Sequence, residues 1–331
     1  MSIAVVILNW NGKKLLEQFL PSVVLFSESA NIYVADNAST DDSVSFVSVT
    51  YPQIRILQNK KNEGYAKGYN LALESLTEDI FVLLNSDVEV TENWLSPVIA
   101  EFERDQKLVA AQPKILDHKN KNYFEYAGAA GGYIDKLGYP YCRGRIFNTI
   151  EKDEGQYNDV ARIFWASGAC FYIRRKAFWD EGGFDEDFFA HQEEIDLCWR
   201  LQARGGLIKY VGNAAVYHVG AATLDSGSPR KTFYNFRNTL LALLKNVKGA
   251  KVWWLLLQRL ALDALAGIQF LLQGKVGHFL AVIRAHFSFY GLVPKFIQKR
   301  KKQASTIKYF RIKSVVWNYF IAKKRNFNNL I

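Results

Sequence analysis

The fold of this chain is decided by residues 80–87, which read IFVLLNSD. Five apolar residues in succession, with no polar alternation, are typical of a strand that is covered on both faces of a sheet. The polar residues Asn85, Ser86 and Asp87 follow at once and would lie at the carboxyl end of that strand. Because open parallel sheets bind ligands at this edge, the stretch predicts a buried strand that delivers polar side chains to a site.

Three earlier segments repeat this pattern. Apolar runs occupy residues 3–8, 32–35 and 54–57, and residues 13–26, 40–49 and 65–76 have apolar side chains at helical spacing. This alternation of strands and helices predicts a mostly parallel sheet with right-handed crossovers. The first run lacks a basic leader and is followed at once by polar residues, so we interpret it as a strand and not as a signal peptide.

Each of the four predicted strands ends in Asn or Asp side chains. The clusters are Asn9 and Asn11, Asp36 and Asn37, residues 59–64, and residues 85–87. One such cluster is ordinary turn or helix-cap chemistry, but four at one edge of a sheet indicate a binding site. Asp36 and Asn9, at adjacent strand ends, could hydrogen-bond the edge of a nucleobase. Gly64 and Gly68 bracket a predicted helix start, where free N–H groups attract phosphate.

Asp87 is the first candidate metal ligand. Asn85 and Asp87 are alternate residues near a strand end, so both can point into one cleft. Their oxygens suit a hard divalent cation that also binds phosphates and water. Alternatively, Asp87 caps a helix that starts near Thr91. His218 follows an apolar run and is either a structural histidine or, if it converges with Asp87 on one ion, a further ligand.

Three acids, Glu193, Glu194 and Asp196, occur within four residues at the start of a predicted amphipathic helix. Acids in a first turn interact favourably with the helix dipole, so a solvated helix face is one interpretation. Repulsion between neighbouring carboxylates would raise at least one pKa, which suits a general base.

Other segments are predicted more coarsely. We expect a Gly/Ala-rich loop or close backbone approach at residues 127–138, a buried strand at 164–173, a loop running into a helix at 188–204, and short strands at 207–211 and 214–217. Neither a G-x-G-x-x-G motif after the first strand nor a Walker A motif occurs, so dehydrogenase and P-loop signatures are missing. Cys142, Cys170 and Cys198 form no C-x-x-C pair, which argues against a disulfide scaffold or a cysteine-ligated zinc site and fits a reducing compartment.

Charge is divided unevenly along the chain. The net charge of +10 combines −9 over residues 1–226 with +19 over residues 227–331, where Asp263 is the only acid. This basic part has helical patterns and many aromatic residues, and its longest uncharged run, residues 264–274, is shorter than the roughly 18 residues that span a bilayer. We interpret it as helices lying on an anionic cytoplasmic leaflet. The alternatives are a helical domain that only packs on the core, and a nucleic-acid-binding surface.

In combination, these motifs resemble the family 2 glycosyltransferases, in particular the bacterial rhamnosyltransferase-like branch. The segments that carry the resemblance are VVILNWNG (5–12), VADNASTD (34–41), NEGYAKGYN (62–70), LLNSD (83–87), SGA (167–169), GGFDE (182–186), EEIDLCWR (193–200) and YH (217–218). The resemblance implies an α/β fold of the GT-A type. It places a catalytic domain at residues 1–225, with a nucleotide-sugar-binding half at 1–100 and an acceptor-binding half at 101–225. Residues 226–331 would form a helical, basic, membrane-associating extension.

The resemblance also implies an activity. It is the inverting, metal-dependent transfer of a sugar, with rhamnose as one candidate, from a dTDP- or UDP-sugar to a glycan or lipid-linked acceptor. The setting would be cell-surface polysaccharide synthesis on the cytoplasmic face of a bacterial membrane, without nucleic acid as a partner. A nucleotidyltransferase of similar topology is a weaker alternative, because it gives the helix with Glu193 and Glu194 no obvious role.

The resemblance assigns roles to individual residues. The nucleotide-sugar site would comprise Asn9, Asn11, Asp36, Asn37, Gly64, Lys67, Asn70, Asn85, Ser86 and Asp87. Asp87 and His218 would hold Mg²⁺ or Mn²⁺, and Glu194 or Glu193 would be the catalytic base. Trp165, Gly168, Asp185 and Arg200 would form the acceptor side.

This sequence departs from the family's pattern at two of these positions. Asn85 stands where the D-x-D pattern has its first aspartate, so metal binding would depend mainly on Asp87. Glu194 stands where the family usually has the aspartate that acts as the base, and its side chain is one methylene longer. The Q-x-x-R-W signature of processive synthases is absent, which favours transfer of one or a few sugars.

Overall fold

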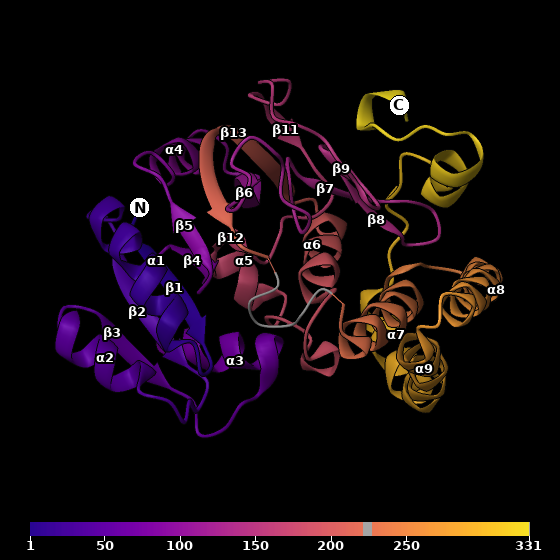
Figure 1. Cartoon of the computed structure of the whole chain (residues 1–331), viewed down its shortest axis with the longest axis horizontal. Helices are drawn as coiled ribbons and strands as arrows, with labels where there is room; N and C mark the ends of the chain where they lie inside the picture. Colours follow the sequence, from indigo (N-terminus) through magenta and orange to yellow (C-terminus); the bar gives the residue numbers. More distant parts are fainter. Residues whose placement is uncertain (221–226, 331) are drawn as a thin grey trace.

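The computed structural model describes residues 1–220 and 227–330. Among these residues a nine-stranded sheet has the order β11-β13-β6-β12-β4-β1-β2-β3, with β5 paired to β13 (Figure 1). Its first half comprises β1 (Ile3–Asn9), β2 (Asn31–Asp36), β3 (Arg55–Gln58) and β4 (Ile80–Asn85), separated by α1 (Lys13–Phe26), α2 (Ser43–Thr50) and α3 (Gly64–Leu73). β1 pairs in parallel with β2 and β4, and β2 pairs in parallel with β3. The predicted alternation and the parallel pairing of this half are confirmed.

The interior positions of β1, β2 and β4 are apolar on both sides because helices cover both faces of the sheet. Val5 and Val82 pack in one core with Leu16 of α1, whereas their neighbours on the opposite face belong to a second core with Tyr69 of α3. The register also aligns the polar strand ends, since Asn9 lies beside Asp36 and Leu8 lies beside Asn85. The carboxyl edge of the sheet therefore concentrates the polar side chains.

The second half of the sheet is mixed. It comprises β5 (Val88–Val90), β6 (Leu108–Asp117), β11 (Val160–Arg162), β12 (Cys170–Arg174) and β13 (Leu207–His218), with α4 (Ser96–Arg104), α5 (Arg175–Asp180), the 3₁₀ helix η1 (Glu186–Phe188) and α6 (Glu193–Ala203). β12 runs antiparallel to both β4 and β6. A small second sheet is formed by β7 (Gly132–Ile134), β8 (Pro140–Cys142), β9 (Arg145–Ile146) and β10 (Thr149–Ile150).

Two strand predictions are wrong in their extent. Only the second part of residues 164–173 is a strand, because the chain turns at Ser167, whose carbonyl accepts a hydrogen bond from the Cys170 N–H. Residues 207–211 and 214–217 are one strand, β13, with a register shift between Val211 and Ala215. Residues 127–138 contain β7 as well as the expected close approach, since a Cβ on Gly132 would lie 2.0 Å from the Trp165 ring.

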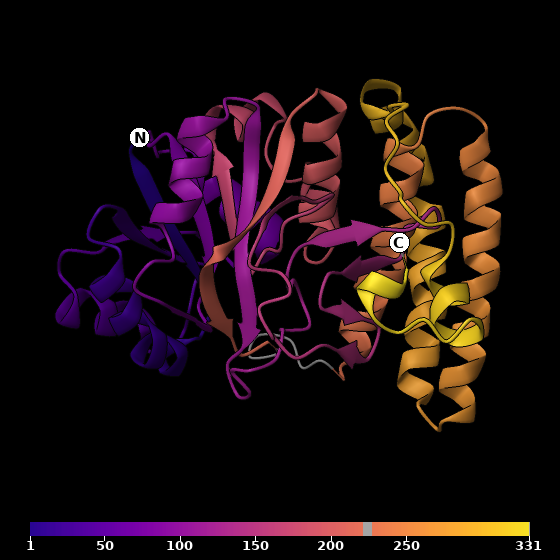
Figure 2. The same ribbon diagram turned by 90° about the horizontal axis from the view of Figure 1, so that it is seen from above.

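The C-terminal part is helical, as predicted. It comprises α7 (Pro229–Asn246), α8 (Lys251–Leu272), α9 (Val276–Gln303), the π-helix η2 (Trp317–Ile321) and the 3₁₀ helix η3 (Phe327–Asn329). Figures 1 and 2 show α7, α8 and α9 side by side at one end of the molecule. Leu240 and Phe296 belong to the same hydrophobic cluster as Tyr69 and Trp199. The predicted boundary at residues 225 and 226 lies outside the described residues, and the core is continuous on its two sides.

Two of these helices, Lys251–Leu272 and Val276–Lys302, are long and apolar enough to cross a membrane by length and composition. The expectation that no segment of this part could span is therefore wrong. The uncharged run is a poor guide here because Arg259 and Asp263 of α8 pair with each other at 2.7 Å and are buried. The outward side of α8 is consequently apolar.

Candidate active site

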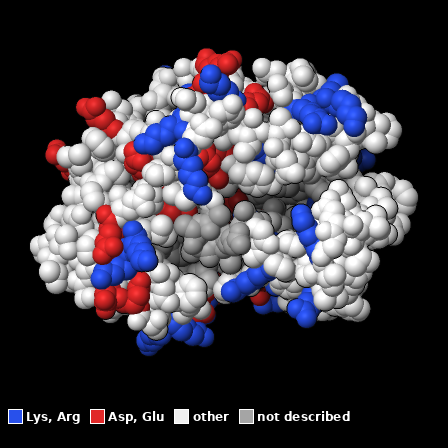
Figure 3. All heavy atoms as spheres, viewed as in Figure 1, with Lys and Arg blue, Asp and Glu red and all other residues white. Residues whose placement is uncertain are grey.

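A pocket of about 780 Å³ opens at the carboxyl edge of β1 and β4. Many of the predicted site residues line it, namely Asn9, Asn37, Gly64, Asn85, Ser86, Asp87, Gly168, Glu193, Glu194 and His218. This volume is within the range of pockets that enclose small ligands. Figure 3 shows acidic side chains gathered beside the central hollow of this face.

Asn9 and Asp36 lie together at the ends of β1 and β2. The Asn9 Nδ2 donates a hydrogen bond to the Asp36 Oδ1 at 3.3 Å, and the Asp36 Oδ2 accepts one from the Ser39 N–H at 3.0 Å. Among the described residues the buried Oδ1 of Asn9 has no hydrogen-bond partner. An unpaired buried acceptor on a pocket wall is a place where a ligand can donate a hydrogen bond.

Asn37 organises the start of α3. Its Nδ2 donates to the Asn62 Oδ1 and to the Gly64 carbonyl, both at 3.0 Å, and its Oδ1 accepts from the Asn59 Nδ2 at 3.1 Å. Gly64 has a φ of +75°, and a Cβ there would lie 2.7 Å from the Phe189 ring. These contacts fix the turn that brings the beginning of α3 to the pocket.

Asp87 and His218 meet on the pocket wall. The Asp87 Oδ1 lies 3.1 Å from the His218 Nε2, and the Asn85 Nδ2 lies 3.4 Å from the same nitrogen. The helix-cap alternative for Asp87 is excluded, because Val88–Val90 form β5 and the next helix, α4, begins at Ser96. His218 therefore lies next to Asp87, and its convergence with Asp87 on one ion stays a prediction.

Glu125 completes this cluster from the other side of the imidazole. Its Oε2 lies 3.4 Å from the His218 Nδ1, and its side chain is buried. Burial lowers the pKa of His218, but the charges of Glu125 and Asp87 outweigh it and raise the pKa to about 10. The position between the two carboxylates thus favours positive charge.

The three acids at the start of α6 have different environments. Asp196 is fully buried, and although burial raises its pKa, the charges of Lys245 and Arg200 lower it overall. Burial, reinforced by the charge of Glu194, raises the pKa of Glu193 well above its ordinary value. Burial also raises the pKa of Glu194 to about 7, and the side chain lines the pocket. The solvated-face interpretation is therefore excluded, and Glu194 is suited to proton transfer near neutral pH.

Several predicted residues lie away from the pocket walls among the described residues. Asn11 accepts a hydrogen bond from the Thr40 N–H at 2.7 Å, and Lys67 pairs with Glu63 at 3.3 Å. Asn70 exchanges two hydrogen bonds of 2.9 Å with the backbone of Phe184. Trp165 is buried, and its indole N–H donates to the Tyr133 carbonyl at 3.0 Å. These contacts hold the segments around the pocket.

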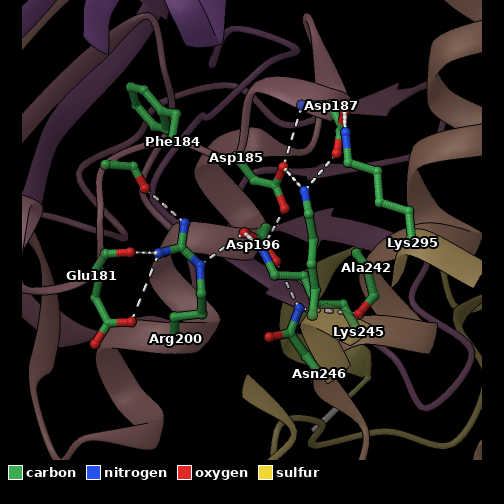
Figure 4. Close-up of polar contacts among 12 residues, drawn as sticks. Glu181, Phe184, Asp185, Asp187, Asp196, Arg200, Ala242, Lys245, Asn246 and Lys295 are labelled. Atoms are coloured by element: carbon green, nitrogen blue, oxygen red, sulfur yellow. Dashed lines mark hydrogen bonds and ion pairs between the residues drawn. The ribbon is translucent and has the colours of Figure 1, made fainter. Parts of the chain in front are cut away.

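Asp185 and Arg200 also lie away from the pocket walls, in a buried ion network (Figure 4). The Lys245 Nζ bridges the Asp185 Oδ2 at 2.7 Å and the Asp196 Oδ2 at 2.8 Å. Arg200 donates to the Asp196 carboxylate at 2.9 Å and to the Glu181 and Gly183 carbonyls. The network joins the Gly-Gly-Phe-Asp-Glu loop, α6 and α7.

The structure adds pocket residues that the sequence did not indicate. They are Trp10, Asp117, Glu125, Arg230, Lys231, Thr232 and Asn235. The last four lie in the first turns of α7, whose N-cap is Ser228 with Pro229 following. A Ser-Pro start is a recognisable helix signal, but only the fold shows that this helix begins at the pocket.

The fold and the site together define a class of protein. A GT-A sheet with a polar pocket at the carboxyl edge of its parallel strands is typical of nucleotide-sugar-dependent glycosyltransferases. The chain belongs to glycosyl transferase family 2, which it matches over residues 4–182. Glu194 and His218 lie beyond the matched region.

Similar proteins agree with this assignment. The chain is 28% identical over 255 residues to an N-acetylglucosaminyl-diphospho-decaprenol L-rhamnosyltransferase of Mycobacterium tuberculosis, covering 72% of this chain and 82% of that protein. Among solved structures it resembles S. aureus TarS in complex with UDP-GlcNAc, with a TM-score of 0.58, 16% identity, and coverage of 91% and 84%. It also resembles a mannosyltransferase from Pyrobaculum calidifontis in complex with GDP-Man and Mn²⁺, with a TM-score of 0.52, 13% identity, and coverage of 90% and 84%. The two structures share the fold with this chain.

Proposed function

We propose that this enzyme transfers a sugar, with inversion at the anomeric carbon, from a dTDP- or UDP-sugar to a hydroxyl of a glycan or lipid-linked acceptor. The observation that carries the proposal is one pocket with the Asp87–His218 pair and Glu194 on its walls. The name of the mycobacterial relative makes rhamnose the first sugar to test. Its pathway would be cell-surface polysaccharide synthesis in a bacterium.

The nucleotide would lie along the ends of β1 and β2. The buried Oδ1 of Asn9, which has no hydrogen-bond partner among the described residues, would accept a hydrogen bond from the base, and Asp36 would orient the Asn9 amide or take a base N–H itself. Arg230 and Lys231 line the same pocket and would place positive charge beside the diphosphate. Asn37, Gly64 and the start of α3 would shape the sugar end of the site.

A divalent cation, Mg²⁺ or Mn²⁺, fits the Asp87–His218 pair, because a carboxylate oxygen and an imidazole nitrogen 3.1 Å apart can serve one ion. Binding of the cation at Nε2 would displace the proton that the raised pKa of His218 keeps there, while the proton on Nδ1 would stay and face Glu125. In the part of the chain that the structure describes, no three His, Cys, Asp or Glu side chains form a complete metal site, so the other ligands would be diphosphate oxygens and water. The bound cation would act as a Lewis acid that stabilises the leaving diphosphate.

Glu194 would act as the general base. Its carboxylate takes the proton of the acceptor hydroxyl while the hydroxyl oxygen forms a bond to the anomeric carbon from the face opposite the diphosphate. The bond between the anomeric carbon and the diphosphate oxygen breaks, and the nucleoside diphosphate leaves. A single displacement of this kind inverts the anomeric configuration, and a base with a pKa near the working pH is efficient.

The acceptor would approach from the side of Gly168 and Glu194. Gly168 has room for no side chain, because a Cβ would lie 2.7 Å from the Tyr65 hydroxyl, which donates to the Gly168 carbonyl. Asp185, Arg200 and Trp165 would support this side of the site through the loops that they anchor. A lipid-linked acceptor requires that the pocket lie close to a membrane.

The C-terminal helices supply a surface for that membrane. Exposed large apolar side chains on α8, α9 and η2 include Trp253, Trp254, Leu257, Leu265, Ile268, Leu272, Phe287 and Trp317. The lobe of α7, α8 and α9 is largely uncharged on the face that Figure 3 shows. Together with the charge of +19 over residues 227–331, this surface fits the interface of an anionic leaflet, with the enzyme on the cytoplasmic face.

A donor panel tests the proposed function. The full-length enzyme is incubated with dTDP-rhamnose, UDP-GlcNAc, UDP-galactose and GDP-mannose, with Mn²⁺, Mg²⁺ or EDTA, and its unfolding temperature is measured. One dTDP- or UDP-sugar should raise the unfolding temperature only when a divalent cation is present. Equal shifts in EDTA would contradict the metal site, and a response to GDP-mannose alone would contradict the donor assignment.

A further inference from the structure

Helix α7 donates hydrogen bonds to the segment that directly precedes the proposed base, Glu194. The fully buried amide of Asn238 donates from Nδ2 toward three carbonyl oxygens, those of Phe188 at 2.9 Å, Ala190 at 2.9 Å and His191 at 2.7 Å. The neighbouring Arg237 donates to the carbonyls of Asp187 at 3.0 Å and Phe188 at 3.1 Å. We call residues 187–192 the base loop, because Glu193 and Glu194 follow it directly.

The base loop needs such contacts to keep its shape. Phe189, His191 and Gln192 have φ values of 64°, 67° and 74°, in the left-handed region that non-glycine residues rarely adopt. Conformations of this kind persist only where surrounding contacts hold them. The Asn238 amide spans these positions, since its acceptors are the carbonyls of residues 188, 190 and 191.

The same face of α7 also binds the helix that follows the base loop. Lys245 is one heptad after Asn238, and its Nζ contacts Asp185 at 2.7 Å and Asp196 at 2.8 Å (Figure 4). The Asn246 Nδ2 donates to the other oxygen of Asp196 at 2.8 Å. Glu194 thus lies between two anchored points, three residues after His191 and two residues before Asp196.

We propose that α7 positions the catalytic carboxylate, with Asn238 and Lys245 as the positioning residues. The proposal rests on the proposed role of Glu194 as the base. Misplacement of a catalytic group by about 1 Å can lower the rate by roughly 100-fold. The basic C-terminal region is therefore part of the catalytic unit, whether or not it also contacts a membrane.

The variant Asn238→Asp tests the proposal in the full-length enzyme. It keeps the size of the side chain but places a carboxylate oxygen where an N–H donor faces three carbonyl oxygens. We expect kcat to fall by at least about 30-fold, while the KM and the Kd for the donor change by less than about 3-fold. Thr239→Val is the matched control, because Thr239 is equally buried and its hydroxyl donates to the Asn235 carbonyl of the same helix; its kcat should stay within about 3-fold of the parent value.

Hydrogen exchange provides a readout that does not need turnover. In Asn238→Asp the amides of residues 187–196 should exchange at least about 10-fold faster than in the parent enzyme, whereas Thr239→Val should leave them unchanged. Lys245→Met, which keeps the length of the side chain and removes the charge, should give the same kcat loss and the same local increase in exchange. Unchanged exchange and an unchanged kcat in a folded Asn238→Asp enzyme would overturn the proposal. Unfolding of both Asn238→Asp and Lys245→Met would also overturn it, because α7 would then contribute to stability alone.

Glu194→Gln separates this inference from the proposed function. If Glu194→Gln is inactive and Asn238→Asp is fully active, only the role of α7 is wrong. If Glu194→Gln keeps full activity, the base assignment fails, and the α7 proposal fails with it.

Discussion

The Nε2 atom of His218 lies 3.1 Å from the Oδ1 atom of Asp87, although 131 residues separate the two in sequence. The contact forms because β13 ends at His218 and pairs with β5, which directly follows Asp87. Val88 is the register partner of His218, so the strand pairing itself delivers both side chains to one point. The proposed metal site is thus a consequence of the sheet topology.

Removal of either proposed ligand should weaken the binding of the divalent cation. We expect Asp87→Ala and His218→Ala each to weaken Mn²⁺ binding in the presence of the nucleoside diphosphate by at least about 10-fold, because each removes a ligand from a site with only two protein donors. Electron paramagnetic resonance of free Mn²⁺ measures the change. His118→Ala, a partly exposed histidine paired with Glu89, is the control and should bind Mn²⁺ as the parent does. Parent-like binding by both site variants would disprove the assignment.

Glu125→Gln should weaken the same site more mildly. The substitution keeps the size of the side chain but removes the charge that faces the His218 Nδ1 at 3.4 Å. Outer partners of metal-ligating histidines typically contribute about 10- to 100-fold in affinity or activity. We expect a loss at the lower end of this range in Mn²⁺ affinity, measured by the same titration. A gain in affinity would show that Glu125 opposes metal binding at this position.

Glu194→Gln should lower kcat by about 100-fold or more and leave donor affinity within about 3-fold, because it removes only the proton acceptor. Glu194→Asp restores the residue type that the family usually has and should keep more activity than Glu194→Gln. Single-turnover kinetics and calorimetric donor binding measure the two effects. Full activity of Glu194→Gln would remove the base assignment, and equal loss in both variants would indicate that length matters more than proton transfer.

The rate should depend on pH through Glu194. Burial raises the pKa of this carboxyl to about 7, and only the deprotonated form can accept a proton. Activity should therefore fall as the pH drops through 7, to about one tenth near pH 6. Burial and the charge of Glu194 also raise the pKa of the neighbouring Glu193. A kcat profile that is flat between pH 6 and pH 8 would contradict this role.

The first half of the sheet and the position of the pocket could be predicted from the sequence. The four apolar runs that end in polar residues gave the parallel half of the sheet and the pocket edge, because local periodicity and strand order determine both. Asn9 and Asp87 were proposed as site residues from these strand ends, whereas Glu194 was proposed from the acidic cluster at a helix start and from the family resemblance. The C-terminal half of the sheet was harder to predict, since the turn at Ser167 contacts the distant Tyr65 and the register shift in β13 arises in its pairing with β6.

Other roles depended on tertiary contacts that no local pattern encodes. Asp185 and Arg200 were predicted to form part of the acceptor side, yet their partners are Lys245 and Asp196. Glu125 and Asn238 carry no motif, and their importance is visible only from what they contact. The composition of α8 was misleading because Arg259 and Asp263, the charged residues in its middle, pair with each other inside the molecule.

Membrane binding should depend on the outward face of α8. Leu265→Asp combined with Leu272→Asp places charge on side chains that are 62% and 83% exposed, and should reduce binding to anionic liposomes by at least about 10-fold. Leu25→Asp combined with Val49→Asp is a control matched in exposure, at 63% and 82%, in the catalytic half. Cosedimentation of the full chain measures binding, and equal effects of the two pairs would contradict the proposed surface.

The central claim is that one pocket holds a metal-bound nucleotide sugar and a glutamate base for inverting transfer. Proton NMR of the transfer product, formed from the donor that the panel identifies and a lipid-diphosphate sugar acceptor, tests it most directly. We predict an anomeric configuration opposite to that of the donor, formed with Mn²⁺ or Mg²⁺ and lost in EDTA and in Glu194→Gln. A product with retained configuration, or one formed equally well in EDTA, would contradict the account.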